Sequence, residues 1–202
     1  DRGKVMSAEE LEAGKDFGRY KDVDGDGIPW RTLPGTHASK GAYFTRGTTR
    51  DAYARYSERG PDYVDNMQRL LRKFRTAASL VPQPVVHMAA KPTRFGVIYF
   101  GSTSPAMHEA LEVLAHEGVM LDAMRLRAFP FPDSVPEFIA AHEKVFVVEQ
   151  NRDGQMQTLL VNELGVDPAK LVRVLHFDGT PITARFIAGA IRKATVWKKE
   201  FA

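Results

Sequence analysis

The segment 144–156, KVFVVEQNRDGQM, decides the fold that this sequence predicts. It opens with the apolar run VFVV and continues directly into Glu149, Gln150 and Asn151, followed by a glycine at position 154. An apolar run bounded in this way is typical of a strand buried on both faces, and the apolar periodicity that follows predicts a helix. In open α/β sheets, ligands gather beyond the carboxyl ends of such strands. Glu149 is therefore a candidate general base, with a helix cap or an interface partner as the alternatives.

The same alternation of strand and helix continues on both sides of this segment. Further strands are predicted at 96–100, 119–127 and 172–177, and helices at 105–116, 136–142, about 154–164 and about 183–194. Strands that alternate with helices are joined by right-handed crossovers and form a mainly parallel sheet. We therefore predict an α/β domain whose mainly parallel sheet carries helices on both faces.

The first part of the chain shows a different pattern. A capping box that begins at Ser7 predicts a short helix ending near Gly14. Residues 15–50 show no sustained period, and irregular segments of this length are usually functional or packed on a partner. A long amphipathic helix is predicted from Gly60 to the prolines at 82 and 84. An irregular arm and a long helix thus precede the sheet.

Composition excludes several classes of function. The 202 residues carry a net charge of only +3 and their basic residues are scattered, which argues against a nucleic-acid surface. Without cysteine, the chain itself provides no disulfide, thiolate nucleophile or cysteine-ligated iron–sulfur cluster. No apolar run approaches the roughly 20 residues of a membrane span, and the amino terminus lacks a signal-peptide core. We expect no nucleic-acid or membrane partner, and a cytoplasmic location.

The acidic turn DVDGDG at 22–27 allows two interpretations. Asp22, Asp24 and Asp26 match the first half of a calcium loop, in which carboxylates two residues apart converge on the cation. The twelfth position of such a loop, which requires a bidentate acid, is Leu33 here. An acidic, glycine-rich turn is favoured, with calcium binding as the alternative.

Two further segments, TLPGTH at 32–37 and KGAYFTRGT at 40–48, combine cations and hydroxyls with glycines. Guanidinium groups supply a forked pair of donors and threonine adds a neutral one, which suits carboxylates and other anions. None of the six histidines shows the helical spacing of a metal site, and only His37, inside these loops, carries a functional expectation. A solvated loop with incidental charge is the alternative.

Eight motifs stand in a recognisable order over about 20–191. They are IPWRTLPGTH at 28–37, KGAY at 40–43, TRGT at 45–48, NMQRLLRK at 66–73, FGST at 100–103, FPFP at 129–132, VEQN at 148–151 with the glycine and glutamine at 154 and 155, and DGTP at 178–181. In this order they resemble the carboxyl-terminal portion of the alpha subunit of 2-oxoacid:ferredoxin oxidoreductases, most closely the 2-oxoglutarate type. Each motif is weak alone, and the strength of the resemblance lies in their common register.

The resemblance implies a division of the chain and a set of partners. Residues 1–48 correspond to the tail of a pyrimidine-type thiamine-diphosphate domain and an irregular connection, 49–94 to a linker with the long helix, and 95–202 to a domain like the transketolase carboxyl-terminal domain. The implied partners are the missing amino-terminal part of the alpha subunit, ferredoxin, and a beta subunit that carries thiamine diphosphate and an iron–sulfur cluster. Thiamine diphosphate with magnesium and the [4Fe-4S] cluster are expected largely outside this chain, and coenzyme A is the implied co-substrate.

The implied reaction is the oxidative decarboxylation of a 2-oxoacid with coenzyme A to an acyl-CoA, carbon dioxide and reduced ferredoxin. Because the chemistry belongs to the cofactor, no residue of this chain is assigned to catalysis. The resemblance places Arg31 near the substrate carboxylates, with a threonine close by. The expected substrate-binding residues are Arg31, Thr45, Arg46, Lys40 and His37.

Two other functions stay open. The first is a non-catalytic interaction module, and the second is a calcium-binding module built on the acidic turn. In the interaction module, as in the enzyme subunit, we expect Glu149, Gln150 and Asn151 to contact a neighbouring domain or subunit. We also expect the chain alone to be inactive.

Overall fold

The computed structural model describes residues 3–44 and 47–196. The chain divides into two compact units, the arm unit, Asp1–Leu80, and the sheet unit, Val81–Ala202. Thr45 and Arg46, two of the expected substrate-binding residues, lie outside the described residues. Within the described ranges, no helix combines the length and the apolar character needed to cross a membrane.

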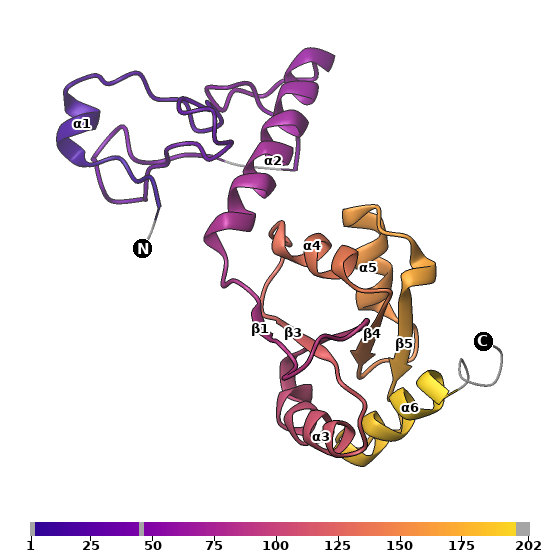
Figure 1. The fold of residues 1–202 in the computed structure, drawn as a ribbon. Coiled ribbons are helices and arrows are strands. Elements are labelled where there is room, and N and C mark those ends of the chain that lie inside the picture. The colour runs from indigo at the N-terminus through magenta and orange to yellow at the C-terminus, as the bar shows by residue number, and fades with distance from the viewer. Residues whose placement is uncertain (1–2, 45–46, 197–202) are drawn as a thin grey trace. The chain divides into compact units, whose positions relative to one another are not determined.

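The sheet unit is built on a five-stranded sheet in the order β1-β3-β2-β4-β5 (Figure 1). Its parallel strands are β2 (Phe95–Phe100), β3 (Asp122–Leu126), β4 (Lys144–Glu149) and β5 (Leu171–Leu175). The edge strand β1 (Val85–His87) pairs antiparallel with β3. The predicted mainly parallel α/β class is confirmed, whereas β1 was not predicted, because three residues after two prolines are too few to show a period.

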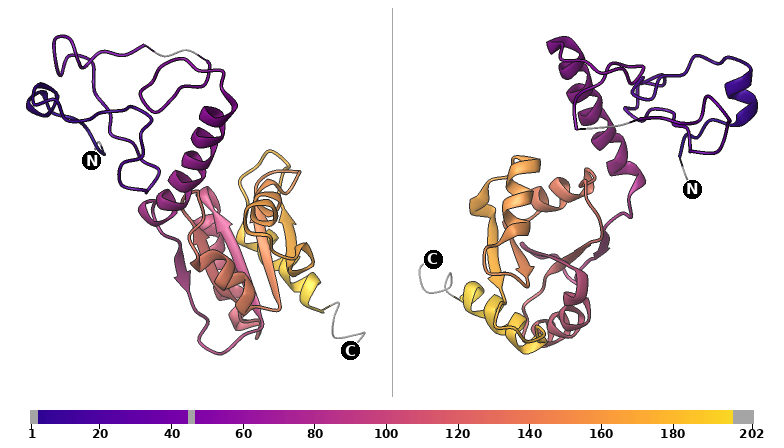
Figure 2. Two further views of the ribbon diagram at one scale, coloured as in Figure 1. Left: turned by 90° about the horizontal axis from the view of Figure 1, so that it is seen from above. Right: turned by 180° about the vertical axis from the view of Figure 1, so that it is seen from behind.

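Helices cover both faces of this sheet, as the views of Figure 2 show. On one face lie α3 (Ser104–His116) and α6 (Ala184–Val196), and on the other α4 (Ser134–Ala141) and α5 (Gln155–Leu164). Short 3₁₀ turns at η1 (Gly101–Thr103) and η2 (Pro168–Lys170) lead into α3 and β5.

The apolar run of β4 supplies both of the resulting cores. Phe146 and Val148 pack with α3 and α6, while Val145 and Val147 pack with α4 and α5. Successive side chains of a strand point to opposite faces, so a central strand covered on both faces has to be apolar at every position. This is why the run VFVV identifies the middle of the sheet.

The arm unit consists of α1 (Ala8–Glu12), an irregular arm and α2 (Gly60–Leu80). The predicted capping box is present, since Ser7 Oγ accepts the Glu10 N–H and the Glu10 carboxylate accepts the Ser7 N–H. The arm lies directly on the backbone of α2 at Gly27, where an added Cβ would be 2.2 Å from the Lys73 nitrogen. Thr76 Oγ1 also donates to the Asp26 carbonyl at 2.6 Å. The irregular arm is therefore fixed to one face of the long helix.

Candidate anion-binding site

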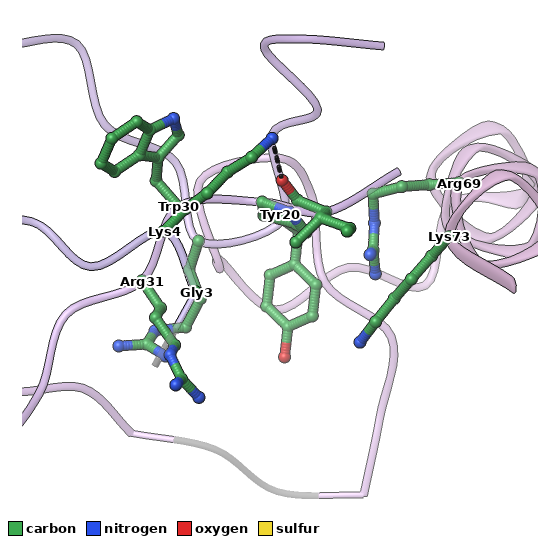
Figure 3. Close-up of a pocket in the computed structure, with 10 residues that line it drawn as sticks. Gly3, Lys4, Tyr20, Trp30, Arg31, Arg69 and Lys73 are labelled. Carbon is green, nitrogen blue, oxygen red and sulfur yellow. Dashed lines mark hydrogen bonds between the residues drawn. The ribbon is translucent and has the colours of Figure 1, made fainter. Parts of the chain in front are cut away.

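A hollow of about 430 Å³ lies between the arm and α2 (Figure 3). Five of its ten lining residues are cations, and two aromatic rings are among the others. The ten are Gly3, Lys4, Arg19, Tyr20, Ile28, Pro29, Trp30, Arg31, Arg69 and Lys73. Such an excess of cations makes the hollow a candidate site for an anion.

Arg31 is held at this hollow by backbone pairing with the start of the arm. Its N–H donates to the Lys4 carbonyl and its carbonyl accepts the Met6 N–H, both at 2.9 Å. Val5 and Arg31 thereby form a parallel bridge. The exposed Arg31 side chain is thus carried by a fixed backbone within an otherwise irregular segment.

Lys4 neutralises part of the acidic turn that the sequence left open as a calcium loop. Its ammonium donates to Asp24 and Asp26, at 2.6 Å each, and to the Ile28 carbonyl at 3.1 Å. Burial alone lowers the pKa of Lys4, but the bonds to Asp24 and Asp26 outweigh it and raise that pKa. The bond from Lys4, together with the Ile28 N–H, lowers the pKa of Asp26.

The third carboxylate of the turn faces elsewhere. Asp22 accepts the Gly27 N–H and Arg72 Nε, each at 3.0 Å. In the described part of the chain, no three His, Cys, Asp or Glu side chains are grouped to hold a metal ion. Since a lysine already binds two of the three acids, the geometry argues against the calcium alternative.

Two arginines of the hollow, the buried Arg69 and the half-buried Arg19, have no carboxylate within 4.0 Å among the described residues. Arg69 is 8% exposed and donates to the Gly27 carbonyl at 3.2 Å and to Asn66 Oδ1 at 3.4 Å, while its Nε has no acceptor there. Arg19 donates to the Thr32 carbonyl at 3.0 Å and lies 3.4 Å from the centre of the Tyr43 ring. Burial lowers the pKa of both arginines.

His37 and Lys40 are not brought to this hollow. His37 Nδ1 accepts the backbone N–H of Ser39 at 3.1 Å and of Lys40 at 2.9 Å, and its Nε2 lies against the Glu12 carboxylate. The Lys40 ammonium donates to the Leu11 carbonyl at 3.0 Å. Both side chains therefore fasten their loop to the end of α1.

Glu149, at the end of β4, is fully buried. Its carboxylate accepts the N–H groups of Met156 at 2.7 Å and Gln157 at 3.0 Å, and the Asn151 amide at 2.8 Å. These donors mean that Glu149 caps α5, one of the three roles considered for it. Of the three residues expected at an interface, Gln150 alone is exposed, and its amide reaches Ser102 Oγ at 3.1 Å.

The sequence pattern did not identify Arg69 and Lys73 as site residues. Their spacing of four residues puts both on one face of α2, opposite the apolar residues from which that helix was predicted. A pair of cations at this spacing was the available signal. Solvated helix faces commonly carry such pairs, so the pattern alone did not distinguish them.

Comparisons with known proteins bear on the family. No protein-family model matches the chain. An alpha subunit of 2-oxoacid:ferredoxin oxidoreductase 2 from Aeropyrum pernix is 30% identical over 198 residues, which cover 95% of this chain and 29% of that protein. An alpha subunit from Saccharolobus solfataricus is 26% identical over 158 residues, covering 76% of this chain and 24% of that protein.

Among solved structures, a 2-oxoglutarate:ferredoxin oxidoreductase from Magnetococcus marinus, with 2-oxoglutarate, coenzyme A and succinyl-CoA bound, has the same fold. It matches with a TM-score of 0.76 and 22% identity, over 89% of this chain and 31% of that chain. Sequence similarity to these alpha subunits thus extends over nearly the whole of this chain, and the solved structure shows that the fold is shared. More narrowly, the resemblance to the alpha subunits of 2-oxoacid:ferredoxin oxidoreductases is confirmed, over a region that spans about 29% of the length of the Aeropyrum relative.

Proposed function

We propose that this chain is the carboxyl-terminal portion of the alpha subunit of a 2-oxoglutarate:ferredoxin oxidoreductase. The assembled enzyme decarboxylates the 2-oxoacid oxidatively, transfers the acyl group to coenzyme A and reduces ferredoxin. Similarity to curated alpha subunits over 95% of the chain supports this proposal. The partners are the remainder of the alpha subunit, a beta subunit and ferredoxin.

The cofactors of this reaction do not fit the residues of this chain. The sequence has no cysteine for a [4Fe-4S] cluster, and the described residues provide no group of three acidic or histidine ligands for the magnesium of thiamine diphosphate. We therefore assign both groups to other parts of the enzyme and derive no step through them. The contribution of this chain is substrate binding and interface formation.

Arg31 is the residue that we propose to bind the distal carboxylate of 2-oxoglutarate. The observation that carries this assignment is its place in a hollow with four other cations. A charge-assisted hydrogen bond of this kind contributes roughly 1.5–3 kcal/mol. Thr45 and Arg46 stay candidates from the resemblance, whereas His37 and Lys40 are second choices because α1 already engages them.

Replacement of Arg31 by alanine in the assembled enzyme tests this function. We expect kcat/KM for 2-oxoglutarate to fall roughly 10- to 100-fold, which corresponds to the loss of one charge-assisted bond. Arg55→Ala is the matched control, because Arg55 is an exposed arginine of the arm that does not line the hollow. If the Arg31 variant keeps the wild-type kcat/KM, the interaction-module alternative is favoured instead.

A further inference from the structure

Of the five cations of the hollow, the proposed function uses only Arg31, and two of the others lie on α2. Arg69 and Lys73 extend from α2 toward Tyr20, and Arg31 lies beyond that ring, as Figure 3 shows. Their spacing of four residues directs both side chains from the same face of the helix. The hollow therefore has two cationic walls, one on the arm and one on α2.

The α2 wall has an incomplete set of partners. Burying a guanidinium is costly unless its charge is paired and its donors are satisfied. Arg69 is 8% exposed; the described residues offer its guanidinium a carbonyl oxygen, an amide oxygen and the Tyr20 ring at 5.7 Å, and leave Nε without an acceptor. An anion in the hollow would supply a directly bonded negative charge, which Arg69 lacks among the described residues.

Lys73 is placed beside Arg69 by the close contact of the arm with α2. Gly27 lies against the Lys73 backbone nitrogen, so the turn and this part of the helix cannot separate without losing that contact. The Lys73 side chain is exposed, and in the described part of the chain its ammonium has no carboxylate within 4.0 Å. It is therefore available to a ligand.

Among the described residues, no acid lies within 4.0 Å of the Arg69 or Lys73 cation, although the charge of Asp22 acts on Arg69. Asp22 pairs with Arg72 at 3.0 Å, and Lys4 takes both Asp24 and Asp26. The hollow keeps a positive excess on two sides, with the Tyr20 ring between them (Figure 3). Two separated positive walls suit a ligand with two separated anionic groups better than a single compact anion.

We infer that the hollow binds a dicarboxylate 2-oxoacid across its width, with one carboxylate on Arg31 and the other on Arg69 and Lys73. This inference rests on the proposed function and deepens it, because it makes α2 a second determinant of substrate specificity. A 2-oxoacid with one carboxylate can engage only one of the two walls.

The test is calorimetric titration of the assembled enzyme, before coenzyme A is added, with 2-oxoglutarate and with its monocarboxylate counterpart 2-oxobutyrate. We expect Lys73→Met and Arg31→Ala each to weaken 2-oxoglutarate binding by about tenfold, as loss of one charged contact implies. For 2-oxobutyrate, only one of the two variants should weaken binding. Arg75→Met is the control, because Arg75 is an exposed cation of α2 that does not line the hollow.

The outcomes separate the inference from the proposed function. If Lys73→Met leaves 2-oxoglutarate binding unchanged, or if both variants weaken 2-oxobutyrate equally, the two-wall inference is wrong. If 2-oxobutyrate binding is weakened by Arg31→Ala and not by Lys73→Met, the two-wall inference is supported but the assignment of Arg31 to the distal carboxylate is wrong. Inorganic pyrophosphate is the last ligand to be titrated. If it binds more tightly than 2-oxoglutarate, and if Lys73→Met abolishes that binding, the hollow is a phosphate site and the dicarboxylate assignment is wrong.

Discussion

The buried carboxylate of Glu149 decides where α5 begins. The residue at the helix N-cap position, Gly154, has φ +66° and no side chain with which to cap the helix. Glu149 reaches the free N–H groups of the first turn from the end of the preceding strand. A negative charge at a helix amino terminus is stabilised by those N–H groups and by the helix dipole. One side chain thus joins the central strand to the following helix.

Replacing Glu149 by glutamine should therefore destabilise the chain. We expect the free energy of unfolding to fall by about 1–3 kcal/mol, because the charge is lost and the new amide N–H₂ faces backbone donors. Urea denaturation followed by far-ultraviolet circular dichroism measures the effect. Glu163→Gln, at an exposed position of the same helix, should stay within about 0.5 kcal/mol of the wild type. Equal stability of the two variants would contradict the capping role.

At the scale of elements, the hollow exists because a glycine lets the acidic turn lie on α2. Gly25 and Gly27 both have positive φ, +75° and +79°, which non-glycine residues rarely adopt. An added Cβ meets nothing within 4 Å at Gly25, but at Gly27 it lies 2.2 Å from the Lys73 nitrogen and 2.7 Å from the Arg69 carbonyl oxygen. Alanine substitutions at Gly25 and Gly27 therefore distinguish the cost of backbone strain, which both share, from the cost of contact with α2, which only Gly27 has.

Gly27→Ala should consequently open the hollow, whereas Gly25→Ala should not. The strain common to both costs roughly 1–2 kcal/mol, and the clash at position 27 adds about 1–3 kcal/mol. The fluorescence of Trp30, which lines the hollow, reports the unfolding of this region when the second tryptophan is replaced by phenylalanine. Similar midpoints for the two alanine variants would show that the turn does not depend on close contact with α2.

The elements that could be predicted from sequence are those with a repeated local pattern. The four parallel strands and their helices repeat apolar residues at strand or helix spacing, and Pro82 marks the end of α2. The hollow has no such signal, because it depends on the approach of Gly27 to Lys73 and of Lys4 to Asp26, contacts between residues far apart in sequence. Arg31 was predicted from family resemblance, and its role stays a proposal. The expected linker at 49–94 also stays a prediction, while the structure divides after Leu80.

For the whole molecule, the decisive feature is the unequal distribution of core between the two units. Among the described residues, the buried hydrophobic side chains lie in the sheet unit, apart from Met6 and Leu11. In the arm unit, α2 instead exposes apolar side chains, among them Val64 and Leu71, each 54% exposed. Buried apolar area is the main source of folding free energy, so we expect the sheet unit to be the more stable of the two units.

Hydrogen exchange of the whole chain should therefore show two levels of protection. Amides of the buried strand β4 should exchange only on global unfolding, whereas those of the arm should exchange through local openings, about a thousandfold faster or more. Mass spectrometry of peptides from 144–149 and from 15–44 measures the difference. Gly27→Ala should accelerate exchange in the arm peptides and leave β4 unchanged. Equal protection of the two sets of peptides in the isolated chain would contradict the expected difference in stability between the arm and the sheet unit.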